Sequence, residues 1–103
     1  MDNQPPDAVR MKQTRLTILS YLNRLYPTPL QVCTLLRVLL AFDETYSLSL
    51  LTKDVTYLRQ KGYVEFVDEK IGGFKHYNKK FVGLTAEGKE IADRTATDDA
   101  LEI

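Results

Sequence analysis

The chain has 103 residues, of which 44% are hydrophobic and 27% charged, so it is long enough for one globular domain and too short for two. Its 14 basic and 14 acidic side chains give a net charge of zero, which argues at face value against a nucleic-acid binder. Cys33 is the only cysteine, and this excludes an internal disulfide and a cysteine-based zinc site.

The first predicted element is a helix that follows a disordered segment at residues 1–6. Asp7 is a suitable N-cap, and the helix is expected to run to about Tyr26. Ile18, Leu22 and Leu25 recur at helical spacing, with Leu19 beside them, so they predict one apolar stripe on this helix.

A second helix is predicted at about residues 30–41, after the break at Pro27. Thr28 as a cap, Pro29 at the first helical position and Gln31 three residues after the cap form a start signal. The helix is apolar nearly all round, which predicts that it lies at the centre of the domain.

A third helix is predicted at residues 47–61, capped by Ser47 or Ser49. Gly62 suits the left-handed position that ends a helix. The residues expected on its buried face are Leu48, Leu51, Val55 and Leu58. Those expected to point outward are Ser49, Thr52, Lys53, Thr56 and Gln60.

Two strands and a last helix complete the chain. Residues 63–68 alternate in polarity and residues 80–84 return, with Gly72-Gly73 at the hairpin tip. Thr85 is expected to cap a helix reaching about Arg94. The order helix, helix, helix, strand, strand, helix predicts one α+β domain at residues 7–96, followed by an acidic flexible tail at residues 97–103.

The charges are polarised along the chain even though they sum to zero. Residues 10–61 carry eight basic and three acidic side chains, whereas residues 81–103 carry two basic and six acidic ones. A field depends on where charges lie, so the total charge does not exclude a local polyanion-binding surface. No apolar run reaches membrane-spanning length and the first residues are polar, so we expect a cytoplasmic protein without a signal peptide or membrane segment.

The segment from Leu48 to Ile91 resembles the winged helix-turn-helix domains of bacterial, archaeal and phage transcription regulators. The shared features are a helix with spaced leucines, the Gly-aromatic-Val sequence at Gly62 and the Leu-Thr-x-x-Gly sequence that ends at Gly88. With the preceding helices, the resemblance extends over about residues 14–94.

The resemblance implies a transcription regulator that binds double-stranded DNA, commonly as a homodimer. Helix 47–61 would enter the major groove, and the wing at residues 68–80 would lie on the phosphate backbone. The implied groove-contacting residues are Ser49, Thr52, Lys53, Thr56 and Gln60. The implied phosphate-contacting residues are Arg15, Lys70, Lys75, His76, Lys79 and Lys80.

Other interpretations stay open at this point. The outward face of the third helix could be an ordinary solvated face. The role of the wing lysines could be limited to preventing edge-to-edge aggregation. A winged helix that binds proteins within a larger assembly is the main alternative, because the net charge is neutral and the wing is aromatic. We expect no enzymatic activity, cofactor or metal site: His76 has no close carboxylate in sequence, and Cys33 lies in an apolar helix with no adjoining basic residue.

Overall fold

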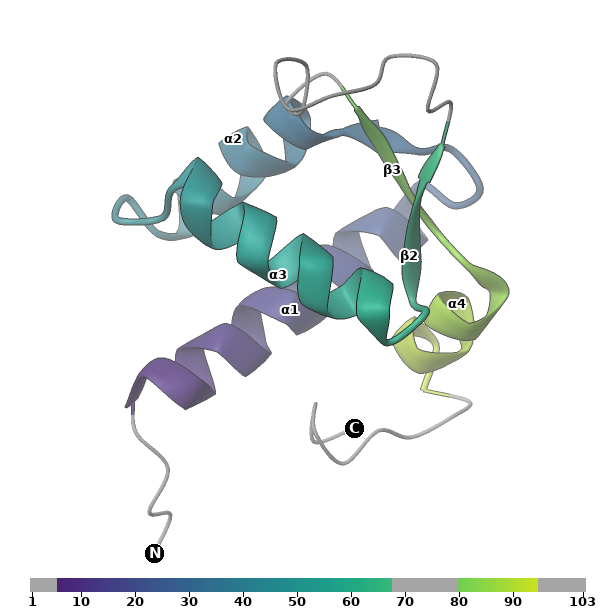
Figure 1. The fold of residues 1–103 in the computed structure, drawn as a ribbon, viewed down its shortest axis with the longest axis horizontal. Helices are drawn as coiled ribbons and strands as arrows, with labels where there is room; N and C mark the ends of the chain where they lie inside the picture. The colour runs from purple at the N-terminus through teal and green to yellow at the C-terminus, as the bar shows by residue number, and fades with distance from the viewer. Residues whose placement is uncertain (1–5, 68–79, 95–103) are drawn as a thin grey trace, which may run out of the picture.

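Within the described residues, the fold combines four helices with a small antiparallel sheet (Figure 1). The computed structural model describes residues 6–67 and 80–94, with side chains described from Arg10 onward. The elements are α1 (Pro6–Arg24), β1 (Leu30–Gln31), α2 (Val32–Phe42), α3 (Leu48–Gln60), β2 (Val64–Val67), β3 (Phe81–Leu84) and α4 (Ala86–Ala92). The sheet order is β1-β3-β2, and both pairings are antiparallel. The predicted α+β class is confirmed, but the predicted order lacked β1.

Helix α1 buries Ile18, Leu19 and Leu22, as predicted. Leu25 was expected on the same stripe but is 41% exposed, because the helix ends at Arg24 and not near Tyr26. The predicted cap is also wrong, since α1 begins at Pro6 and therefore contains Asp7. The predicted acidic tail, and all but the last residue of the predicted disordered segment, lie outside the described residues.

The predicted start of the second helix is wrong because its first residues form a strand. Leu30 pairs with Val82 and Gln31 pairs with Phe81, which makes β1 an edge of the sheet. Gln31 then serves as the N-cap of α2 without a side-chain cap hydrogen bond. The N–H of Val32 donates to the carbonyl of Lys80 at 2.9 Å, so the sheet contact continues into the start of α2.

The strands β2 and β3 are close to their predicted positions. Val64 pairs with Leu84 and Phe66 pairs with Val82, so β3 lies between the other two strands. The hairpin tip expected at Gly72-Gly73 falls outside the described residues. None of the helices in the described part of the chain combines the length and the apolar character that a bilayer-crossing segment needs.

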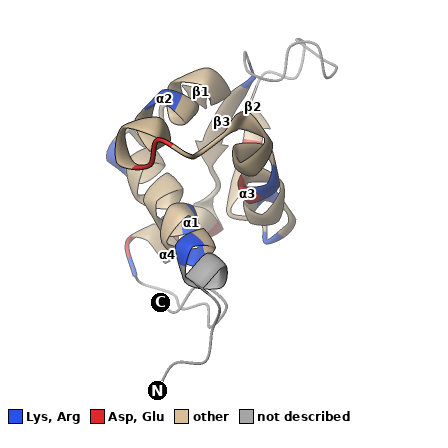
Figure 2. Cartoon of the chain, turned by 90° about the vertical axis from the view of Figure 1, so that its left-hand side faces the viewer, with Lys and Arg blue, Asp and Glu red and all other residues tan. Residues whose placement is uncertain are grey.

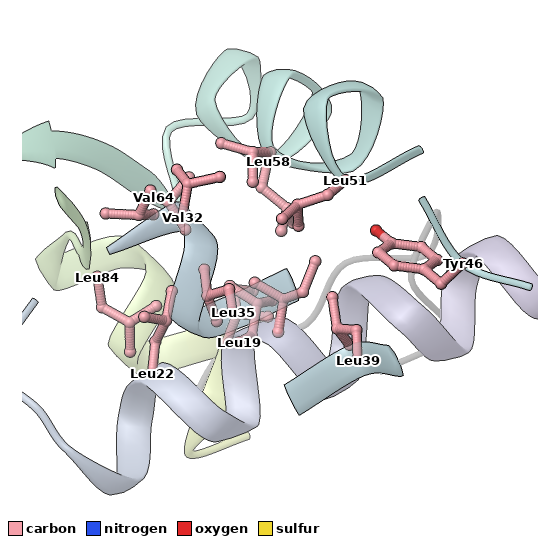
Figure 3. Packing of buried hydrophobic residues seen from close by; sticks show 14 residues of the cluster. Leu19, Leu22, Val32, Leu35, Leu39, Tyr46, Leu51, Leu58, Val64 and Leu84 are labelled. Carbon is pink, nitrogen blue, oxygen red and sulfur yellow. The ribbon is translucent and has the colours of Figure 1, made fainter. Parts of the chain in front are cut away.

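One hydrophobic core joins the three long helices, the sheet and α4 (Figure 3). In this view Leu19 and Leu22 of α1 and Leu35 of α2 lie below Leu51 and Leu58 of α3. Helix α2 supplies fewer buried residues than its apolar sequence predicted. Phe42 at its end is 76% exposed, because only one face of α2 meets the core. The core residues contributed by α2 are Val32, Leu35 and Leu39.

The two sequence motifs that carried the resemblance meet in the fold. The N–H of Thr85 donates to the carbonyl of Tyr63 at 3.1 Å, and the Thr85 hydroxyl donates to the carbonyl of Gly62. Thr85 also caps α4 as predicted, because its Oγ1 accepts from the N–H of Gly88 at 3.0 Å. A Cβ on Gly88 would lie 1.9 Å from the Tyr63 carbonyl oxygen, so a glycine is required for this close approach. These contacts fix the end of α3 against the start of α4.

Candidate nucleic-acid interface

Helix α3 is held at both ends by residues that the sequence singled out. Ser47 is the N-cap, and its side chain accepts from the N–H of Leu50 at 3.2 Å. Gly62, with φ of 82°, takes the predicted left-handed position after the helix. Leu51, Val55 and Leu58 are buried against the core, which sets the rotation of the helix about its axis. Leu48 was predicted on this face but is 37% exposed, since it lies in the first turn.

The outward face of α3 carries a strip of polar side chains. Ser49, Lys53, Thr56 and Gln60 are all exposed, and their spacing of four, three and four residues places them in one line. Thr52 lies beside this strip and is half-buried, and its hydroxyl donates to the carbonyl of Leu48 at 2.8 Å. We call the four exposed residues the α3 strip. It extends over about 16 Å along the helix axis at 1.5 Å per residue.

Two cations from different elements meet on the ring of Phe66 in β2. The guanidinium carbon of Arg59, in the last turn of α3, lies 5.0 Å from the ring centroid. Lys80 Nζ, just before β3, lies 4.8 Å from the same centroid. Both distances fit cation–π attraction to the same ring. The antiparallel pair of β2 and β3 forms a two-stranded ribbon, and we call Arg59, Lys80 and Phe66 the ribbon-base cluster.

The ribbon-base cluster was only partly predicted. Lys80 was among the predicted phosphate-contacting residues, whereas Arg59 was missed. Its spacing of seven residues from Thr52 puts it on the same side of the helix, and this signal could have identified it. The other predicted wing residues lie outside the described residues: Lys70, Lys75, His76 and Lys79.

The Arg15 side chain is largely buried, so it does not take the exposed position implied for a phosphate contact. Its Nε lies 3.1 Å from Oδ1 of Asp54, and its guanidinium carbon is 3.7 Å from the ring centroid of Tyr57. The Arg15 side chain is 12% exposed and that of Asp54 is 5% exposed. Tyr46 donates from its hydroxyl to Oδ2 of Asp54 at 2.7 Å. Because this network engages the guanidinium, we leave Arg15 out of the candidate interface.

The described carboxylates near α3 are turned away from the α3 strip or paired. Asp54 is buried and paired with Arg15. Glu65 in β2 is exposed, and side-chain alternation places it on the face of the sheet opposite Phe66. Figure 2 shows acidic positions in the loop between α2 and α3, where Asp43 forms an ion pair with Arg10. Among the described residues, Lys53, Arg59 and Lys80 are therefore the charged side chains of the α3 strip and the ribbon-base cluster, and all three are cations.

The described residues hold no group of potential metal ligands, and their one cysteine is half-buried. Within residues 6–67 and 80–94, no three His, Cys, Asp or Glu side chains lie together in a way that could hold a metal ion. Cys33 is half-buried, and its Sγ lies 3.7 Å from Oε1 of Gln31. The arrangement presents hydrogen-bonding and cationic groups, which are suited to binding.

Comparisons with protein-family models, with curated proteins and with solved structures found no match for this chain. The class that the structure defines is a small α+β domain, with three strands in one antiparallel sheet among residues 6–67 and 80–94.

Proposed function

We propose that the chain is a winged helix-turn-helix protein that binds duplex DNA and acts as a small transcription regulator. In this proposal α3 enters the major groove, and residues 68–80 lie on the phosphate backbone. The element order supports it, because α3 follows α2 through a short loop and leads directly into the antiparallel β2–β3 ribbon. The β1 strand, which the sequence did not predict, extends the sheet beyond β3.

The observation that carries the proposal is the meeting of Arg59 and Lys80 on Phe66. This contact joins the last turn of α3 to the residue that precedes β3. It supports a proposal in which the helix and the ribbon act together as one cationic surface on the duplex. Phosphate contacts position a protein on the duplex, and base contacts specify the sequence. We assign the first role to Arg59 and Lys80 and the second to the α3 strip.

The chemistry of the α3 strip suits base edges. Serine and threonine hydroxyls donate to or accept from several bases, glutamine can bind adenine in a bidentate manner, and lysine donates to guanine O6 and N7. Ser49, Lys53, Thr56 and Gln60 supply these groups from an exposed helix face. We also propose that two copies bind together, because a two-fold dimer would present two α3 helices to half-sites about one helical turn apart.

Fluorescence anisotropy with labelled random duplex DNA tests the proposal at low and moderate salt. We expect binding that weakens steeply as salt rises, since cations that neutralise phosphates release counterions. Selection of bound oligonucleotides from a random pool should then return a preferred site, and replacement of both Lys53 and Gln60 by alanine should remove that preference. Arg37→Ala is the matched control, because Arg37 is exposed on α2 outside the candidate interface. Binding that is absent or indifferent to salt would overturn the proposal.

A protein-interaction module is the second candidate, and the exposure of two leucines favours it. Leu48 and Leu50 in the first turn of α3 are 37% and 39% exposed. An exposed apolar pair beside a polar strip is typical of a protein-binding surface. This candidate gains support if DNA binding fails while Leu48→Ser abolishes capture of a partner protein.

A further inference from the structure

A pocket lies between the N-terminal half of α1 and the first turns of α3. Its volume is about 270 Å³. Met11 of α1 and Leu50 of α3 contribute its apolar wall, and both are large side chains left about two-fifths exposed, at 40% and 39%. Ligand pockets for drug-sized molecules start at about 300 Å³, so this one suits a smaller ligand with an aliphatic body.

The charges around the pocket favour an anion. Asp54 lines it, but the carboxylate is neutralised by Arg15 at 3.1 Å and also accepts from Tyr46 at 2.7 Å. Arg10 also lines it and is ion-paired with Asp43. The remaining charged residue, Lys53, is exposed and makes no ion pair with another described residue. One uncompensated cation therefore stands beside an apolar wall.

We propose that this pocket binds a small aliphatic carboxylate, with its carboxylate on Lys53 and its chain between Met11 and Leu50. A charge-assisted hydrogen bond from an ammonium group orients the head, and burial of the chain supplies the hydrophobic contribution. The site goes beyond DNA binding, yet it shares Lys53 with the α3 strip. A bound carboxylate would therefore remove one positive charge from the proposed DNA surface and weaken DNA binding.

The test is a titration of the full chain, isotopically labelled, with octanoate in the absence of DNA and followed by NMR. We expect saturable shifts at Met11, Thr14 and Leu50. Octan-1-ol and octylammonium carry the same chain without the negative charge and should bind at least about tenfold more weakly, the loss expected for one charged hydrogen bond. If either binds as tightly as octanoate, or if the octanoate shifts lie elsewhere or do not saturate, the proposal is overturned.

Two pairs of variants separate the pocket from general effects. Lys53→Gln should weaken octanoate binding by about tenfold. Lys61→Gln removes the same charge at the C-cap of α3, about 12 Å further along the helix axis, and should not weaken it. Leu50→Asp should abolish octanoate binding, whereas Leu48→Asp places the same carboxylate in the same helical turn outside the pocket and should preserve it. Equal effects within either pair would contradict the site. Because these assays contain no DNA, their outcome is independent of the DNA-binding proposal.

Discussion

The Nε of Arg15 lies 3.1 Å from Oδ1 of Asp54, and this buried pair joins the middle of α1 to the inner side of α3. The hydroxyl of Tyr46 and the ring of Tyr57 complete its surroundings. Because a buried ion pair tolerates little misalignment, it restricts the rotation of α3 about its own axis. The pair therefore helps to determine which α3 residues face outward as the α3 strip.

Removal of one partner of this pair should destabilise the fold strongly. Asp54→Ala leaves the Arg15 cation buried without its counterion, and such changes cost about 3 kcal/mol or more. We expect a loss of that size in the free energy of unfolding, measured by urea denaturation followed by circular dichroism. Tyr46→Phe removes the hydrogen bond from the Tyr46 hydroxyl to Oδ2 of Asp54 and should cost about 1 kcal/mol.

The control for Asp54→Ala is Lys53→Ala, because Lys53 is the exposed neighbour of Asp54 on the same helix. It should change the free energy of unfolding by less than about 0.5 kcal/mol. The double variant with Arg15→Met and Asp54→Leu replaces both charges by apolar groups and should recover much of the lost stability. A loss below about 1 kcal/mol for Asp54→Ala would show that the pair contributes little.

The features of the fold that the sequence predicted correctly depend on local chemistry. Ser47 and Thr85 cap the helices that follow them, and Gly62 takes a positive φ after α3. In each case the residue and its partner are close in sequence, so spacing was enough. The outward direction of the α3 strip was also predictable from helical periodicity.

The features that were missed depend on partners far along the chain. Leu30 and Gln31 form a strand only because β3 lies beside them, and the nearby Thr28 and Pro29 gave a misleading helix-start signal. The resemblance implied a phosphate contact for Arg15. Its partner in the fold, Asp54, is 39 residues away in sequence, so no local pattern indicated the pairing. Tertiary contacts of this kind override local propensity.

Gly88→Ala should destabilise the protein, although glycine-to-alanine changes inside helices normally stabilise by about 1 kcal/mol. The added Cβ would lie 1.9 Å from the Tyr63 carbonyl oxygen, so the backbone of α4 or of residue 63 must move. We expect a loss of about 3 kcal/mol in the free energy of unfolding, the upper range for overpacking. Thermal and urea denaturation would measure it.

Gly62→Ala is the comparison for Gly88→Ala. At Gly62 φ is 82° and an added Cβ would meet nothing within 4 Å, so the cost is backbone strain alone. That cost is about 1 kcal/mol. If Gly62→Ala proved more harmful than Gly88→Ala, the close approach of α4 to Tyr63 would not be the reason for the glycine.

Asp93 should make stability depend on pH in the acidic range. Its carboxylate accepts from Lys89 Nζ at 2.8 Å and from Asn23 Nδ2 at 2.7 Å, which ties α4 to α1. These hydrogen bonds, that from Lys89 first, hold the pKa of Asp93 below its ordinary value of 3.8. The ionised carboxylate therefore stabilises the fold above that value, and its contribution is lost as pH falls through the lowered pKa.

Asp93→Ala should accordingly lower the melting temperature slightly at pH 7. The difference from the unmodified chain should shrink as the solution is acidified below the ordinary pKa of 3.8. NMR titration of the Asp93 carboxyl carbon measures the pKa directly, and Asn23→Ala should raise that pKa toward the ordinary value. A carboxyl that titrates at or above 3.8 would contradict the assignment.

Arg59→Gln and Lys80→Gln should each weaken DNA binding in a salt-dependent way. Both cations lie within 5.0 Å of the Phe66 centroid, where one stretch of phosphate backbone could reach them together. Each lost phosphate contact should reduce the slope of log K against log salt by about 0.9, and the double variant should lose about 1.8. The slopes come from anisotropy titrations at several salt concentrations, with a site returned by the oligonucleotide selection.

Arg37→Gln changes the net charge equally but lies on α2, so the salt slope of this variant should match that of the unmodified chain. If all three single variants lowered the slope alike, the effect would reflect net charge and not the ribbon-base cluster.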